Sequence, residues 1–239
     1  MSPAPKAPRF WAVVPAAGIG TRMGGETPKQ YLPLLGRPII AHTLSVLCDH
    51  AGIAGVVVVL APGDEWWPQV PMKFARPLLL ATGGDTRRDS VLNGLEALAQ
   101  RADDDDWVLV HDAVRPCLRH EDLDRLMDEL GNDEVGGLLA TPVKDTMKRS
   151  SANNRVRETI NRESLWHAQT PQMFRLGALR DALRLTVDED RDVTDEAQAM
   201  ELAGARPRLV QGHEDNIKIT RREDLELAEM FLSRRGTSR

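Results

Sequence analysis

A glycine-rich segment with two basic residues is the part of the sequence best suited to phosphate chemistry. It starts as Ala16-Ala17-Gly18-Ile19-Gly20 and continues to Lys29, with Arg22 between them. Small residues let successive backbone amides approach phosphate oxygens, and such amides bind anions. Arg22 and Lys29 add positive charge, which suits a polyphosphate whose negative charge grows during a reaction. The segment therefore predicts a phosphate-binding loop rather than a surface loop with two solvated bases.

This loop departs from two common phosphate-binding patterns. The dinucleotide pattern fits Gly18 and Gly20, but its third glycine position is Met23. The P-loop needs lysine and then serine or threonine after its last glycine, whereas Gly25 is followed by Glu26. The displaced glycine argues against an NAD-dependent oxidoreductase.

The elements that would position the loop follow an alternating α/β pattern. Apolar runs predict strands at residues 10–16, 56–60, 77–81, 107–110 and 136–142. Helical spacing of apolar residues predicts helices at residues 38–49, 90–101 and 121–130. Continuous apolar strands separated by helices indicate a parallel sheet covered on both faces. A loop after the first strand lies at the edge where such sheets bind ligands.

Two segments break this alternation. Residues 144–163 hold few large apolar side chains and predict a hairpin that turns at Asn153-Asn154. A polar hairpin cannot bury a face by itself, so we expect it to lean on something else, such as another subunit. Thr220-Arg221-Arg222-Glu223 fits a capping box, which predicts the start of an amphipathic closing helix.

Composition limits the class of protein. The chain has 239 residues, 41% of them hydrophobic and 28% charged, with a net charge of −5. This balance argues against a sequence-independent nucleic-acid or anionic-membrane binder, and no apolar run is long enough to span a bilayer. Cys48 and Cys117 lack metal spacing and predict reduced thiols in a cytoplasmic protein. We expect a disordered tail at residues 1–9 and a single domain at 10–239.

Further motifs follow the loop in a characteristic order. They are Leu35-Gly36-x-Pro38, Gly83-Gly84-Asp85-x-x-Arg88-x-Ser90, His111-Asp112-Ala113-Val114-Arg115-Pro116, Asp145-Thr146-x-Lys148, Arg162, Trp166-x-x-Gln169-Thr170-Pro171-Gln172, Thr194-Asp195-Glu196-Ala197 and Asn216-x-Lys218-Ile219-Thr220. The loop alone resembles the nucleotidyltransferases that join a nucleoside monophosphate to a sugar or polyol phosphate. The whole series, over roughly residues 10–233, is similar to the 2-C-methyl-D-erythritol 4-phosphate cytidylyltransferase family of the non-mevalonate isoprenoid pathway.

The resemblance implies a fold and a reaction. The fold would be a Rossmann-like, mainly parallel sheet flanked by helices, of the nucleotide-diphospho-sugar transferase type, with residues 144–163 as a protruding β-hairpin arm. That arm would cross to a second subunit and make the protein a homodimer. The enzyme would transfer CMP from CTP to methylerythritol phosphate and release pyrophosphate, by in-line attack of the acceptor phosphate on the α-phosphorus. At pH 7 a phosphate monoester is largely a dianion, so no protein base is required.

The resemblance also implies roles for individual residues. Arg22 and Lys29 would stabilise the transition state and the departing pyrophosphate. The residues expected on the CTP side are Ala16, Ala17, Gly18, Gly84, Asp85 and Ser90. Those expected on the acceptor side are Asp112, Thr146, Arg162, Thr194 and Lys218, with Thr146 and Arg162 serving the neighbouring subunit. We expect Mg²⁺ to be held mainly by the CTP phosphates, with Asp112 as its candidate protein ligand.

Plainer structural interpretations compete with several of these roles. Ser90 and Thr194 are also typical helix caps, and Asp112 is placed to pair with Arg115. His111 and His167 could act as acid–base groups, but we expect both to be structural.

We expect residues 103–106, an acidic run, to be solvated.

Two alternative functions also have to be considered. One is a cytidylyltransferase acting on ribitol-5-phosphate or another sugar phosphate. The other is a catalytically silent nucleotide-binding regulator, which would be expected to have lost Arg22 or Lys29, and both residues are present.

Overall fold

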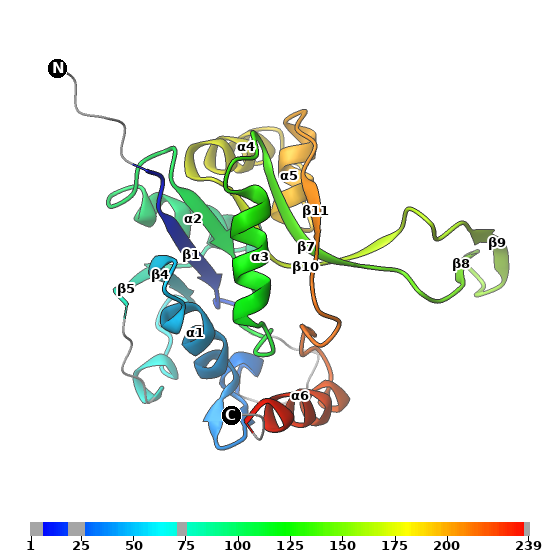
Figure 1. Ribbon diagram of the computed structural model, residues 1–239, viewed down its shortest axis with the longest axis horizontal. Helices are drawn as coiled ribbons and strands as arrows, with labels where there is room; N and C mark the ends of the chain where they lie inside the picture. The colour runs from blue at the N-terminus through cyan, green and yellow to red at the C-terminus, as the bar shows by residue number, and fades with distance from the viewer. Residues whose placement is uncertain (1–6, 19–26, 71–75, 237–239) are drawn as a thin grey trace.

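A seven-stranded sheet forms the centre of the protein in the computed structural model, which describes residues 7–18, 27–70 and 76–236. The strand order is β11-β7-β10-β6-β1-β4-β5 (Figure 1). The strands are β1 (Phe10–Pro15), β4 (Ile53–Leu60), β5 (Leu78–Thr82), β6 (Trp107–Val110), β7 (Gly136–Pro142), β10 (Trp166–Arg175) and β11 (Arg208–Gln211). β10 is antiparallel to both of its neighbours, and the other neighbouring pairs are parallel. The expected mainly parallel sheet is confirmed.

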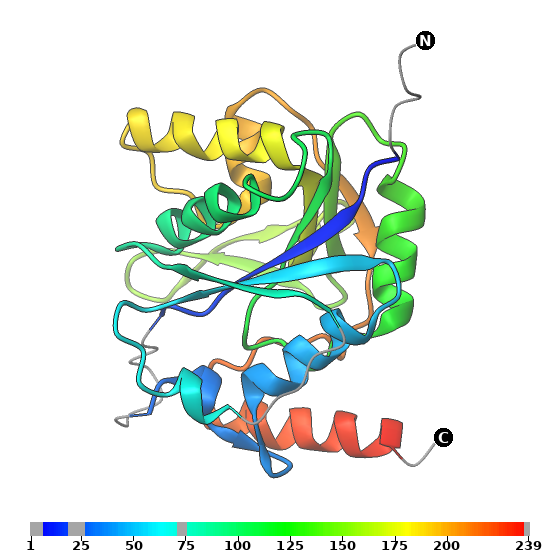
Figure 2. The same cartoon turned by 90° about the vertical axis from the view of Figure 1, so that its left-hand side faces the viewer.

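Helices cover both faces of this sheet (Figure 2). One face packs against α1 (Ile39–Asp49) and α3 (His120–Leu130), and the other packs against α2 (Arg87–Leu98), α4 (Leu176–Asp188) and α5 (Glu196–Leu202). The alternation of side chains along β1 explains the two cores, because Ala12 and Val14 enter the first while Trp11 and Val13 enter the second.

The closing helix α6 (Arg222–Gly236) packs through Ala228 on a small third cluster with Leu34, Ile39 and Val114. Its first turn differs from the predicted capping box. The carboxylate that accepts the amides of Thr220 and Arg221 belongs to Asp224, not to Glu223, and the Thr220 hydroxyl donates to the same oxygen.

The predicted bounds hold at two of the buried strands, whereas β4 begins three residues before its predicted start at residue 56. The strands at residues 107–110 and 136–142 have the predicted ends. Helix α2 begins at Arg87 instead of Ser90, because Thr86 caps it in a reciprocal pair with Asp89. The short strands β2 (Pro33–Leu34) and β3 (Arg37–Pro38) and the 3₁₀ turns η2 (Lys29–Tyr31) and η3 (Trp67–Gln69) complete the regular elements in the described ranges.

The predicted hairpin is present as an arm that extends away from the sheet (Figure 1). It consists of β8 (Met147–Ser150) paired antiparallel with β9 (Val156–Ile160). Asn154 lies in the turn with a φ of 58°, a conformation that asparagine tolerates better than most residues. Met147 and Val156 are exposed on the arm, so the arm buries little within its own chain.

Two residues differ from expectation: Arg9 of the N-terminal segment, expected to be disordered, and Asp106 of the acidic run, expected to be solvated. Asp106 is only 3% exposed, not solvated. Its carboxylate accepts hydrogen bonds from the Arg9 amide at 2.7 Å, the Arg9 guanidinium at 2.9 Å and the Trp11 indole at 3.1 Å. Arg9, which was expected in the disordered tail, is therefore held against the sheet.

Cys48 and Cys117 are both buried free thiols. Within the described ranges, no helix combines the length and the apolar character that crossing a membrane requires.

Candidate active site

A pocket opens at the carboxyl ends of β1, β5 and β6, where the chain order reverses on either side of β1. Open α/β sheets bind ligands at such a reversal. The pocket has a volume of about 360 Å³, within the range of roughly 300–1,000 Å³ usual for small-molecule sites. The sequence-predicted residues that line it are Ala16, Ala17, Gly18, Lys29, Gly84, Asp85, Ser90, Asp112 and Lys218.

Backbone hydrogen bonds fix the start of the glycine loop. The Ala16 amide donates to the Val59 carbonyl at 2.8 Å, which extends the β1–β4 pairing by one residue. The Ala16 carbonyl accepts from the Gln30 amide side chain at 2.7 Å, which ties the segment after the loop back to its beginning. Lys29 is thereby held beside Ala17 at the pocket.

The turn after β5, which forms another wall of the pocket, requires a residue without a side chain at Gly83. A Cβ there would lie 2.4 Å from the Ala17 Cβ and 2.9 Å from the Ser90 hydroxyl oxygen, closer than atoms can approach. The Gly83 amide also donates to the Leu60 carbonyl at 2.7 Å. Glycine therefore lets the turn after β5 close against the loop after β1.

Ser90 shapes this turn instead of capping a helix. Thr86 is the N-cap of α2, so the capping interpretation of Ser90 is wrong. The Ser90 hydroxyl donates to the Thr86 carbonyl at 2.9 Å and accepts from the Gly84 amide at 3.2 Å. The hydroxyl thus holds the Gly84 backbone at the pocket wall.

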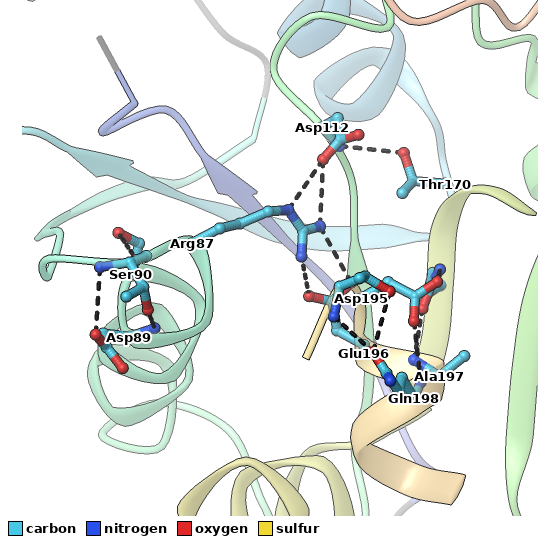
Figure 3. Close-up of polar contacts among 12 residues, drawn as sticks. Arg87, Asp89, Ser90, Asp112, Thr170, Asp195, Glu196, Ala197 and Gln198 are labelled. Atoms are coloured by element: carbon cyan, nitrogen blue, oxygen red, sulfur yellow. Dashed lines mark hydrogen bonds and ion pairs between the residues drawn. The ribbon is translucent and has the colours of Figure 1, made fainter. Parts of the chain in front are cut away.

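Asp112, which was predicted to bind the acceptor, contacts three positively charged side chains. Its Oδ1 accepts from Arg87 Nη2 at 3.2 Å, and its Oδ2 lies 2.9 Å from Lys218 Nζ and 3.5 Å from Arg115 Nε (Figure 3 shows the Arg87 contacts). Burial by itself would raise the pKa of Asp112, but the positive charges of Arg87, Lys218 and Arg115 outweigh it and lower the pKa well below its ordinary value. Asp112 is therefore an anion at neutral pH, and its pairing with Arg115 is one part of a larger network.

His111 is structural, as expected. It is fully buried, its Nδ1 lies 2.9 Å from the Thr170 hydroxyl oxygen, and its Nε2 lies 3.1 Å from the Arg115 carbonyl. Burial lowers the pKa of His111 to about 4, so the ring is neutral at pH 7. Since the Thr170 oxygen also accepts from the Asp112 amide at 3.1 Å, the ring fixes the turn that carries Asp112. His167 lies exposed on β10.

Three predicted acceptor residues lie outside this pocket. Thr146 and Arg162 are exposed at the base of the arm, where the Arg162 guanidinium donates to the Lys144 carbonyl. Thr194 is exposed just before α5, and its amide donates to the Gln198 side chain at 2.7 Å. The N-cap of α5 is Asp195, so the capping interpretation of Thr194 is also wrong. Arg22 lies outside the described residues.

The sequence interpretation missed two charged residues at the site. Arg87 lines the pocket, and Glu196, 1% exposed, pairs with it at 2.6 Å. Each lies inside a motif that was recognised, but neither was given a role. The motif arginine that was singled out, Arg88, instead donates to the carbonyls of Thr186 and Arg191 behind the pocket.

The described side chains do not form a cation cage. No group of three or more His, Cys, Asp or Glu residues suited to a metal occurs within the described ranges. Asp85 and Asp112 are the carboxylates at the pocket, and both oxygens of Asp112 face positive side chains. This donor set fits a divalent ion that is held mostly by phosphate oxygens and water.

Comparison with known proteins gives consistent matches. The sequence profile of the family described as 2-C-methyl-D-erythritol 4-phosphate cytidylyltransferase matches residues 10–234. Two proteins of that name are among the similar relatives. The one from Azoarcus sp. (strain BH72) is 56% identical over 230 residues, which cover 95% of this chain and 96% of that protein. The one from Pseudomonas entomophila (strain L48) is 54% identical over 220 residues, which cover 92% of this chain and 94% of that protein.

Solved structures agree with the sequence matches. The Francisella tularensis 2-C-methyl-D-erythritol 4-phosphate cytidylyltransferase superposes with a TM-score of 0.81 at 34% identity, covering 93% of this chain and 99% of that one. A crystal structure of a 4-diphosphocytidyl-2C-methyl-D-erythritol synthase gives a TM-score of 0.82 at 36% identity, with coverage of 94% and 99%.

Proposed function

The chain belongs to the 2-C-methyl-D-erythritol 4-phosphate cytidylyltransferase family, and from this membership we propose how its residues divide the reaction. It is a nucleotidyltransferase that transfers CMP from CTP to 2-C-methyl-D-erythritol 4-phosphate, giving 4-CDP-2-C-methyl-D-erythritol and pyrophosphate. The relatives do not favour ribitol-5-phosphate as the acceptor.

The observation that carries the assignment of roles is that one pocket joins the Ala16–Gly18 backbone, the Gly84–Ser90 turn and the Asp112–Lys218 pair. The first two features come together at Gly83, where a Cβ would meet both Ala17 and Ser90, and they suit the nucleotide. Cytosine needs an acceptor for its exocyclic amine and donors for its ring carbonyl. We propose that backbone groups of the Ala16–Gly18 segment and of the turn that Ser90 holds at Gly84 make these contacts.

Catalysis in this proposal consists of positioning and charge stabilisation. Lys29 neutralises charge on the triphosphate and on the departing pyrophosphate, together with Arg22 as the sequence suggests. Lys218 binds the acceptor phosphate, which attacks the α-phosphorus in line as a dianion. No side chain has to remove a proton from it, and the neutral, buried ring of His111 suits a structural role.

A divalent ion fits this scheme as part of the nucleotide complex. Mg²⁺ bound to the triphosphate would neutralise phosphate charge, with Asp112 and Asp85 as the nearest protein carboxylates.

The arm suits a role in a homodimer. Its residues 144–159 are exposed, and it extends away from the sheet that carries the pocket (Figure 1). We propose that Thr146 and Arg162 complete the acceptor side of the neighbouring subunit's pocket. The cytoplasmic location expected from the sequence stays a prediction.

A substrate panel tests the assignment. Purified protein with Mg²⁺, CTP and methylerythritol phosphate should release pyrophosphate, whereas ATP, GTP and UTP should be poor donors. Turnover with ribitol-5-phosphate but not with methylerythritol phosphate would reject the assignment.

A further inference from the structure

The Arg87 guanidinium joins two carboxylates that come from distant parts of the chain (Figure 3). Arg87 is the first residue of α2, Asp112 follows β6, and Glu196 is the first residue of α5. Arg87 Nη1 donates to Glu196 Oε1 at 2.6 Å, and Nη2 donates to Glu196 Oε2 and Asp112 Oδ1, both at 3.2 Å. A planar guanidinium with several fixed donors can make these bonds together.

Both carboxylates are deeply buried and contact positively charged side chains. Glu196 is 1% exposed and Asp112 is 6% exposed. A buried carboxylate left without its cation is strongly destabilising. Arg87 is the cation on Glu196 in the described structure and shares Asp112 with Lys218 and Arg115.

The charge balance of this cluster leaves Lys218 available for a ligand. Three positive side chains, Arg87, Arg115 and Lys218, face the two negative ones, so one positive charge is in excess. Lys218 is the most exposed of the three, at 39%, compared with 32% for Arg87 and 12% for Arg115. The excess charge is therefore most accessible at the ammonium group proposed to bind the acceptor phosphate.

Arg87 also fixes where α5 begins. On the sheet side, the Ala197 amide donates to Gln172 Oε1 at 2.7 Å, and Gln172 Nε2 donates to Asp195 Oδ2 at 3.0 Å. On the pocket side, the Arg87 guanidinium donates two hydrogen bonds, a fork, to the Glu196 carboxylate. Thr194 lies two residues before Glu196, so its distance from the pocket depends on this fork.

We propose that Arg87 is a positioning residue for the acceptor substrate, a role that rests on the proposed acceptor contacts of Lys218 and Thr194. It shares the Asp112 carboxylate with Lys218, so that the cluster keeps a net positive charge at Lys218 for the acceptor phosphate, and it holds the start of α5 in place. The nucleotide side is held by other contacts, because the Gly84 turn is fixed by Ser90 and the helix cap by Thr86 and Asp89.

The test is a comparison of Michaelis constants. Arg87→Gln should raise the KM for methylerythritol phosphate about tenfold or more, while the KM for CTP changes by less than about threefold. Arg87→Lys keeps one charge but cannot hold two carboxylates together, so it should restore part of the acceptor affinity. Glu196→Gln removes the charge that anchors α5 and should weaken acceptor binding less than Arg87→Gln does.

Loss of Arg87 alone leaves Glu196 buried without a cation, so that variant can fail to fold. The double variant Arg87→Gln with Glu196→Gln replaces the pair by two neutral amides and should stay folded. It should keep the high acceptor KM and a near-normal KM for CTP. Arg184→Gln is a matched control, because Arg184 of α4 pairs with Glu96 of α2 at 2.5 Å and neither residue lines the pocket.

Equal increases in both Michaelis constants, or unchanged constants in folded Arg87→Gln or the double variant, would overturn the inference. Activity losses that only follow thermal unfolding would overturn it as well. If wild-type protein itself fails to transfer CMP to methylerythritol phosphate, the assigned reaction fails instead. If the wild-type protein is active and the Arg87 variants have unchanged Michaelis constants, only the role of Arg87 is contradicted.

Discussion

Lys29 lies in the turn η2 and lines the pocket beside Gly18 and Ala17. We expect Lys29→Ala to lower kcat about 100- to 1,000-fold, because an electrostatic contact to developing charge is lost. Pyrophosphate release measures the rate, and circular dichroism with thermal unfolding checks the fold. Arg184→Gln again serves as the control for removing a cation elsewhere. A near-wild-type rate in folded Lys29→Ala would refute the role of Lys29.

His111 predicts a pH dependence of stability. Its pKa is about 4 in the folded protein and 6.5 in the unfolded reference, so the unfolded chain binds more protons between these values. The contribution of His111 to the free energy of unfolding is complete above about pH 6.5 and is lost as the pH falls toward 4, by the order of 3 kcal/mol.

Urea denaturation at pH 7 and pH 4.5 measures this contribution. We expect wild-type protein to lose more stability over this interval than His111→Asn, which has no ring to protonate. Parallel losses in the two proteins would show that His111 does not titrate as inferred.

The sequence predicted single residues well when their chemistry was local. Gly84 and Ser90 were placed on the CTP side by the family resemblance of one short motif, and both line the pocket. Arg87 was missed because its partners Asp112 and Glu196 are 25 and 109 residues away along the chain. The burial of Asp106 was missed for the same reason, since Arg9 is 97 residues away.

Gly83 lets the turn after β5 approach the loop after β1, and a side chain at this position should disturb that contact. Gly83→Ala places a Cβ against Ala17 and Ser90, so the turn after β5 must move from the loop after β1. We expect the KM for CTP to rise about tenfold, in line with an overpacking cost of roughly 1–3 kcal/mol.

Gly94→Ala is the matched control for this crowding. Its Cβ would lie 2.7 Å from Val13 and Val59 in the core beneath α2, away from the pocket. It should lower the melting temperature and leave the KM for CTP close to that of wild type. Gly83→Ala with an unchanged KM for CTP would contradict the proposed nucleotide side.

Among the elements, buried strands with a continuous apolar pattern were predictable, and β10 was not. Its middle reads Gln169-Thr170-Pro171-Gln172, which looks like a polar loop. In the fold these residues are buried because distant groups satisfy them, as Ala197 and Asp195 do for Gln172. Such partners are visible only after the chain has folded.

The proposed exchange of arms concerns the whole molecule and predicts complementation between two inactive variants. A mixed dimer of Lys29→Ala and Arg162→Ala subunits contains one pocket with an intact body and an intact arm. Purified through two different tags, it should regain about half of the wild-type activity, as expected for one restored site in a symmetric pair. A mixed dimer no more active than either parent would show that Arg162 does not act across subunits.

The central claim is that CTP binds at the carboxyl end of β1, and a crystal structure with CTP bound tests it most directly. We predict the triphosphate along the Ala16–Gly18 backbone and Lys29, with cytosine against Gly84 and Ser90. The chain has a second groove, lined in part by Arg119, His213 and Arg235. A nucleotide bound in that groove, with the β1 pocket empty, would contradict the account.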